Sequence, residues 1–241
     1  MKLLLENKLE FNDDSYQIKK DALVKYDGDS NVVIIPEGIK EIRNGAFYNI
    51  SYVTHAVLPS TIEKIGKEAF KNTSLKSINL PEGLTSIGSG AFHGCRHLEK
   101  IKLPKSLISI GSAAFRYTGI AKVILPPNLE DMESAVFRGC EELTEIIFPK
   151  KPKFTVIPKY FAIHSPIIHL KIPEGIRAIM DYAFASTKTV ILPKTLGYAA
   201  KYSFMEAEGV YLKTKKPLFY YAPGFSFPSG IDFITDYLGE Y

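Results

Sequence analysis

Hydrophobic residues recur along this chain in a fixed order, with a period of 20 to 24 residues. In the clearest unit, residues 75–95, Ile78 and Leu80 alternate with Asn79, which is the pattern of a strand with one buried face. Pro81 ends this strand because proline has no amide hydrogen to donate to a neighbouring strand. The unit therefore opens with a short, half-buried strand.

A second short strand and a tight turn complete the unit. Leu84 and Ile87 return to the core, and the following Ser-Gly-Ala-Phe sequence predicts a tight turn that places Phe92 inside. The same order recurs eight times, with prolines at Pro36, Pro59, Pro81, Pro104, Pro126, Pro149, Pro173 and Pro193, followed by Phe47, Phe70, Phe92, Phe115, Phe137, Phe161, Phe184 and Phe204. We number the coils 1 to 8 by these prolines.

A repeat this short cannot fold alone, so each coil must bury its apolar face against its neighbours. The pattern predicts a mainly β solenoid with a parallel β-sheet of about eight short strands, one before each proline. Tight or 3-10 turns are expected on the other side. The phenylalanines, one per coil, are expected to form a continuous aromatic spine.

The repeat also resembles a known family. The order Leu-x-x-Ile-x-Leu-Pro-x-x-Leu-x-x-Ile-Gly-x-x-Ala-Phe-x-x-Cys, complete in residues 75–95 and repeated from Leu98 to Phe115, is similar to BspA-like leucine-rich repeats. The similarity runs from about Val32 to Phe204. It implies a leucine-rich-repeat-like solenoid. It also implies a role in adhesion or recognition, because family members are commonly bacterial surface or secreted proteins that bind host or bacterial partners.

Three segments follow from this pattern. Residues 1–30 are expected to form an N-terminal cap, since residues 16–28 resemble the hairpin that often precedes such repeats. Residues 31–205 hold about eight repeats. Residues 206–241, rich in Phe and Tyr, are expected to form an aromatic C-terminal cap, with an aromatic docking surface as the alternative.

The chain shows no sign of catalytic, metal-dependent or nucleic-acid chemistry. Its five histidines are scattered over several repeat positions, and no nucleophile, zinc or phosphate-loop motif occurs. The net charge of +4 comes from 30 basic and 26 acidic residues that are spread evenly. We expect a protein that is not an enzyme, needs no metal or cofactor and does not bind nucleic acid.

Membrane and export signals are also missing from the pattern. No apolar run is long enough to cross a bilayer, and Glu6 interrupts the apolar start before the core of a signal peptide forms. As written, the chain is expected to be cytoplasmic. An extracellular or cell-surface location is the alternative if the chain is trimmed.

Cys95 and Cys140 occupy the same position in coils 3 and 5, three residues after the phenylalanine. Two steps of stacked strands separate them by roughly 10 Å, whereas the Cα atoms of a disulfide lie within about 7 Å. Both are expected to be free thiols in a small, mostly buried column.

The residues that point outward from the first strands carry the clearest functional signal. One outward column lies two residues before each proline: Ile34, Val57, Asn79, Lys102, Ile124, Ile147, Lys171 and Ile191. The other lies four residues before it: Val32, His55, Ser77, Lys100, Lys122, Glu145, His169 and Thr189. Five members of the first column are β-branched and apolar, where a solvated face is expected to be mostly polar.

These columns predict an apolar patch with a cationic rim, suited to an acidic and apolar protein partner. The predicted partner-binding residues are Lys100, Lys102, Lys122, Ile124, Ile147 and Lys171. We therefore expect a non-catalytic protein–protein interaction scaffold. The alternatives are a sheet without a binding role, in which isoleucine and valine only favour strand formation, a cell-surface or secreted adhesion module, and a carbohydrate-binding protein.

Overall fold

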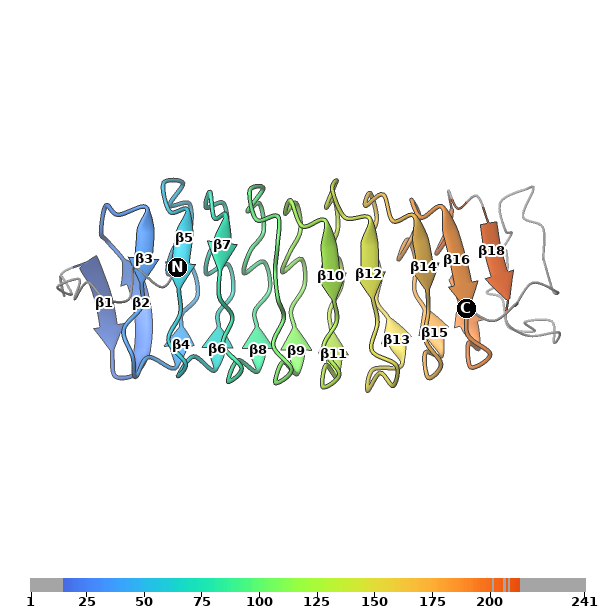
Figure 1. The fold of residues 1–241 in the computed structure, drawn as a ribbon, viewed down its shortest axis with the longest axis horizontal. Coiled ribbons are helices and arrows are strands. Elements are labelled where there is room, and N and C mark those ends of the chain that lie inside the picture. The colour runs from blue at the N-terminus through green and yellow to red at the C-terminus, as the bar shows by residue number, and fades with distance from the viewer. Residues whose placement is uncertain (1–14, 201, 206, 208, 213–241) are drawn as a thin grey trace.

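The computed structural model describes residues 15–200, 202–205, 207 and 209–212, and it is an elongated stack of coils (Figure 1). Each coil runs through one strand position before its proline and a second one after it. These positions form two rows of short strands along the stack, which we call the first row and the second row. The predicted mainly β repeat solenoid is confirmed.

The first row contains β3 (Val32–Ile34), β5 (His55–Val57), β7 (Ser77–Ile78), β10 (Lys122–Ile124), β12 (Glu145–Ile147), β14 (His169–Lys171), β16 (Thr189–Leu192) and β18 (Gly209–Leu212). The second row contains β4 (Glu41–Ile42), β6 (Lys64–Ile65), β8 (Ser86–Ile87), β9 (Ser109–Ile110), β11 (Asp131–Met132), β13 (Val156–Ile157), β15 (Ala178–Ile179) and β17 (Tyr198–Ala199). Neighbouring strands within a sheet of either row pair in parallel.

Neither row is one continuous sheet. The first row divides into β3-β5-β7, β10-β12 and β14-β16-β18, and the second row divides after β11 into a longer sheet and β13-β15-β17. The predicted single sheet of about eight strands is therefore divided at two places: coil 4 has no strand at residues 100–102, and β12 does not pair with β14. In Figure 1 the first row shows this interruption between β7 and β10.

A hairpin begins the described part of the chain. β1 (Tyr16–Lys19) and β2 (Ala22–Tyr26) pair antiparallel, with Lys20 in the left-handed region of the turn at φ 58°. β2 then pairs in parallel with β4, so the hairpin extends the second row and covers its first coil. Of the predicted C-terminal cap, only residue 207 and β18 lie within the described residues, and β18 adds a parallel strand to the first row.

The phenylalanines form the predicted spine, and all eight are buried. From Phe47 to Phe137 successive rings stack nearly parallel, with centroids 4.7 to 5.5 Å apart. At Phe161 the arrangement changes, because its ring stands at 90° to that of Phe137 and 79° to that of Phe184. The change coincides with the longest repeat, in which Phe148 also contacts Phe161 at 6.4 Å.

The cysteine column lies beside this spine and is buried, as predicted. The thiol of Cys95 donates to the Phe70 carbonyl at 3.1 Å, and Thr73 donates to the same oxygen at 2.9 Å. Cys140 and Thr118 repeat this arrangement at the carbonyl of Phe115. Burial raises the pKa of the Cys95 thiol to about 11, so the thiol stays protonated near neutral pH.

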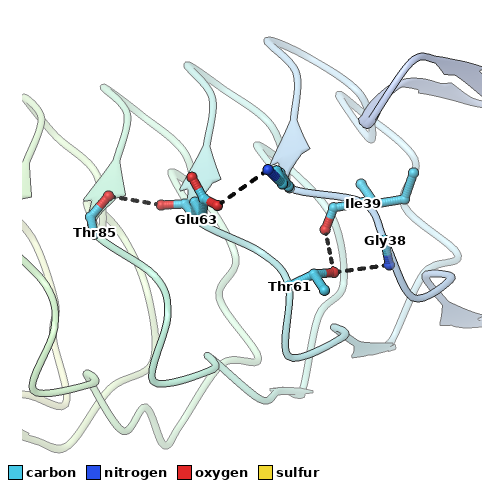
Figure 2. Close-up of polar contacts among 6 residues, drawn as sticks. Gly38, Ile39, Thr61, Glu63 and Thr85 are labelled. Carbon is cyan, nitrogen blue, oxygen red and sulfur yellow. Dashed lines mark hydrogen bonds and ion pairs between the residues drawn. The ribbon is translucent and has the colours of Figure 1, made fainter.

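Polar contacts also join the coils outside the core. Figure 2 shows Thr61 of coil 2, whose hydroxyl accepts from the Gly38 N–H at 3.1 Å and donates to the Ile39 carbonyl at 2.7 Å. In the next coils, Thr85 donates to the carbonyl of Glu63 at 3.1 Å. The Thr61 hydroxyl therefore satisfies two backbone groups of the preceding coil, and Thr85 adds a second hydrogen bond to a carbonyl that already accepts from its own N–H.

Candidate binding groove

The pairing of the last first-row strand before the interruption, β7, ends early at Asn79. In a regular step, such as coil 5 to coil 6, the Leu125 N–H donates to the Ile147 carbonyl at 2.9 Å. At the equivalent place in coil 2, the Leu58 N–H instead donates to the Asn79 Oδ1 at 2.8 Å, and the Asn79 Nδ2 donates to the Leu58 carbonyl at 2.9 Å. The asparagine side chain thus replaces a backbone contact, and the regular ladder ends there.

Residues 100–102, in the next coil, remain unpaired on both sides. Within the described chain, their backbone N–H groups find no hydrogen-bond acceptor. Strand β10 pairs with β12 on one side only, so its other edge faces these residues without a strand partner. Edges of this kind offer hydrogen-bonding groups to another extended chain.

The core is less tightly covered at the same place. The inward residues Val123 and Leu170 of neighbouring first-row strands are buried, as the alternation predicts. The equivalent Ile78 and Ile101, together with Leu80, are only partly buried. The interruption therefore brings core side chains toward the surface.

An open groove of about 1050 Å³ lies over the coil 4 and coil 5 part of this interruption. One stretch from each of these two coils contributes most of its lining, so the groove follows the direction of the strands. Its apolar residues include Ile101, Leu103, Ile124, Leu125 and Pro126. Ile124 is the most exposed of them, with 58% of its surface accessible.

The charged lining of the groove is mainly basic. The basic members are Arg96, Lys100, Lys102, Lys105 and Lys122, and the acidic members are Glu82, Glu99 and Glu142. Lys122 forms an ion pair with Glu145 at 2.7 Å, whereas Lys100 and Lys102 make no ion pair with any described residue. The groove therefore carries positive charge that its own acidic residues do not fully balance.

The structure brings together four of the residues that the sequence predicted for partner binding. Those that line the groove are Lys100, Lys102, Lys122 and Ile124. Ile147 lies directly beside Ile124 in the paired strands β10 and β12. Lys171 lies apart from the groove, in a smaller hollow of about 330 Å³ that it shares with His169 and Ile191.

Sequence reasoning missed the roles of two residues in this part of the first row, Ile101 in the groove lining and Asn79 in the coil before it. Ile101 was expected inside the core, and Asn79 was placed in an outward column without a specific role. A signal was nevertheless present, because Asn79 is the only amide side chain in its column. Its amide can both accept from and donate to one backbone unit, which the apolar and lysine members of the column cannot do.

Among the described residues, no three His, Cys, Asp or Glu side chains come together in a way that would hold a metal ion. The same part of the chain contains no helix with the length and apolar character required to cross a bilayer.

Solved structures with a similar fold are bacterial leucine-rich repeat proteins. The Bacteroides ovatus protein is 23% identical with a TM-score of 0.64, and the match covers 83% of this chain and 64% of that one. A Treponema protein, T. pallidum leucine-rich repeat protein, is 24% identical with a TM-score of 0.55, covering 82% and 81%. The Eubacterium ventriosum protein is 17% identical with a TM-score of 0.58, covering 80% and 66%.

These likenesses show the fold, and this chain spans less than two thirds of the length of the B. ovatus protein. No curated protein sequence matches the chain. The sequence pattern of the BspA type leucine-rich repeat region matches residues 6–97, 63–191 and 155–218, in six copies. Together these matches extend over most of the chain and agree with the coils described above. The chain therefore belongs to the BspA-type leucine-rich repeat family.

Proposed function

We propose that this protein is a non-catalytic binding scaffold whose groove holds an extended segment of a partner protein. The segment would carry acidic and apolar side chains in alternation. The observation that carries the proposal is the groove itself, which places exposed Ile124 and partly buried Ile101 next to unpaired lysines. Apolar contact would supply affinity, and the lysines would attract acidic groups.

An extended segment fits the backbone as well as the side chains. The open edge of β10 and the unpaired N–H groups of residues 100–102 provide hydrogen-bonding groups beside the groove. A peptide that adds to such an edge gains backbone hydrogen bonds, while alternate side chains face the surface. Lys100 and Lys102 are themselves two residues apart, which matches the spacing of alternate side chains in an extended segment.

The direct test uses a labelled synthetic peptide of alternating glutamate and valine, with fluorescence anisotropy as the readout. We expect it to bind more tightly than peptides of alternating lysine and valine or of alternating glutamate and glycine. Ile124→Ser should lower affinity about tenfold, equivalent to ~1.4 kcal/mol. Ile108→Ser is the matched control, because Ile108 is 43% exposed but does not line the groove.

Charge reversal separates the groove from the rest of the strand face. Lys100→Glu combined with Lys102→Glu should slow association and reduce its dependence on salt. Lys171→Glu, on the same row but outside the groove, should leave the rates nearly unchanged. The proposal fails if Ile124→Ser binds like the unaltered protein, or if Lys171→Glu weakens binding as much as the reversal in coil 4.

A further inference from the structure

A second basic feature lies on the turns that follow the buried phenylalanines. The residue directly after the phenylalanine is Lys71 in coil 2, His93 in coil 3, Arg116 in coil 4 and Arg138 in coil 5. We call these four residues the turn column. The phenylalanine rings of coils 2 to 5 repeat every 5.3 to 5.5 Å, and one member of the column follows each ring. Burial, with the charges of Arg116 and Lys71, lowers the pKa of His93, so the positive charge of the column comes from Lys71, Arg116 and Arg138.

Tyrosine rings position the two arginines. The Arg116 guanidinium carbon lies 4.6 Å from the centre of the Tyr117 ring, and its Nη2 donates to the Tyr117 hydroxyl at 2.9 Å. The Arg138 guanidinium carbon lies 5.5 Å from the centre of the Tyr160 ring. Contacts between guanidinium groups and aromatic faces of this kind hold the planar group in a fixed orientation.

The backbone makes room for this arrangement. Tyr117 adopts φ 57°, at a turn position that is asparagine in coils 1 and 2 and glycine in coils 3 and 5. Its ring lies over Gly139 of coil 5, where a Cβ atom would stand 2.4 Å from the ring. A bulky residue with positive φ carries a conformational cost, so tyrosine is an unfavourable residue at this turn position, where glycine or asparagine is preferred.

The arginines are not balanced by nearby acidic groups. Lys71 pairs with Glu68 at 2.8 Å, but neither Arg116 nor Arg138 forms an ion pair with any residue that the structure describes. Their Nε atoms are shielded from solvent and find no hydrogen-bond partner there. The hydrogen bond from Arg116 lowers the pKa of Tyr117, and the charges of Arg138 and Arg96 act in the same direction.

We propose that the turn column binds a linear polyanion whose sulfate or phosphate groups lie in a row. Arg116 and Arg138 would form the centre of the site, with His93 and Arg96 at its margin. Planar guanidinium groups make paired hydrogen bonds to tetrahedral oxyanions, and successive coils present such groups at regular intervals. The two central arginines do not line the groove, whereas Arg96, at the margin of the site, also belongs to the groove lining.

The test uses two probes, a heparin oligosaccharide of defined size and a medium-chain inorganic polyphosphate, with binding measured by calorimetry at low and moderate salt. At least one probe should bind, with an affinity that decreases as salt increases. If heparin binds more tightly, the natural ligand is a sulfated glycan. If polyphosphate binds more tightly, the natural ligand is a phosphate chain. The Arg116→Gln and Arg138→Gln double variant should lose at least about tenfold in affinity, or ~1.4 kcal/mol.

Matched variants separate a built site from general positive charge. Arg43→Gln with Arg177→Gln removes the same charge from exposed positions elsewhere and should change affinity less than about twofold, or ~0.4 kcal/mol. The Arg116→Lys and Arg138→Lys double variant keeps the charge but lacks the planar guanidinium group. Its loss of affinity should lie between those of the two glutamine double variants. Far-UV circular dichroism verifies that each variant is folded.

Three results would overturn the proposal. The first is that neither probe binds at low salt. The second is an equal loss of affinity in the two glutamine double variants, which would mean that net charge alone attracts the probes. The third is tighter binding of a single-stranded oligonucleotide than of either probe, because the ligand would then be a nucleic acid.

Discussion

The stability of the solenoid should depend strongly on Phe92, near the middle of the parallel ring stack. Phe92 is fully buried, and its ring centroid lies 5.5 Å from that of Phe70 and 5.3 Å from that of Phe115. Truncation of a buried phenylalanine to alanine costs about 3 to 5 kcal/mol. Because the substitution removes a ring contact on each side, we expect Phe92→Ala to lower the free energy of unfolding by about 4 to 5 kcal/mol.

The loss should act on two coil interfaces at once. Each coil of a solenoid contacts only its neighbours, so a cavity at Phe92 weakens the contacts of coil 3 with both coil 2 and coil 4. The stack would then unfold in parts rather than in one step. A lower slope of the unfolding free energy against urea would report this loss of cooperativity.

Urea unfolding followed by far-UV circular dichroism measures the effect, since the chain has no tryptophan to report by fluorescence. Phe92→Leu is the control, because leucine keeps most of the apolar volume and loses the ring contacts. It should cost about 1 to 2 kcal/mol. A cost below about 1 kcal/mol for Phe92→Ala would refute the view that the aromatic stack holds the coils together.

Two further predictions concern the interrupted row and the buried thiols. Asn79→Leu removes both hydrogen bonds to the Leu58 backbone and should destabilise the fold by about 1 to 3 kcal/mol, measured by urea unfolding; unchanged stability would mean that the backbone closes the ladder by itself. Cys95 and Cys140 should resist alkylation at pH 8 in the folded protein, since deprotonation of Cys95 requires a pH near 11, and both should react once the protein is unfolded. A disulfide found under denaturing, non-reducing conditions would contradict the repeat alignment.

Much of the fold could be predicted from the sequence because each coil carries its own pattern. The alternation before Pro126, for example, predicts that Val123 is buried and Ile124 exposed, and both are confirmed. The recurring phenylalanines predict the spine, and the position of Cys95 predicts its burial. Such inferences depend only on which face of a short element meets the core.

The contact of the Asn79 side chain with the backbone of coil 2 could not be predicted in the same way. Its amide competes with a backbone carbonyl for the Leu58 N–H, and the outcome depends on backbone positions in two coils. The same limit applies to the turn column, where the positions of Tyr117 and Arg116 depend on the space above Gly139. The exposed lysines of the groove followed from periodicity, but the hollow between them did not.

The breaks in the two rows of strands do not coincide along the stack. Where the first row is open between β7 and β10, the second row continues through β8, β9 and β11. Where the second row stops after β11, the first row still joins β10 to β12. Where the first row is open again, between β12 and β14, β13 pairs with β15 in the second row. Every step from coil to coil therefore keeps at least one parallel ladder. We therefore expect the stack to bend more easily at the groove than elsewhere, which would change the width of the groove without separating its coils.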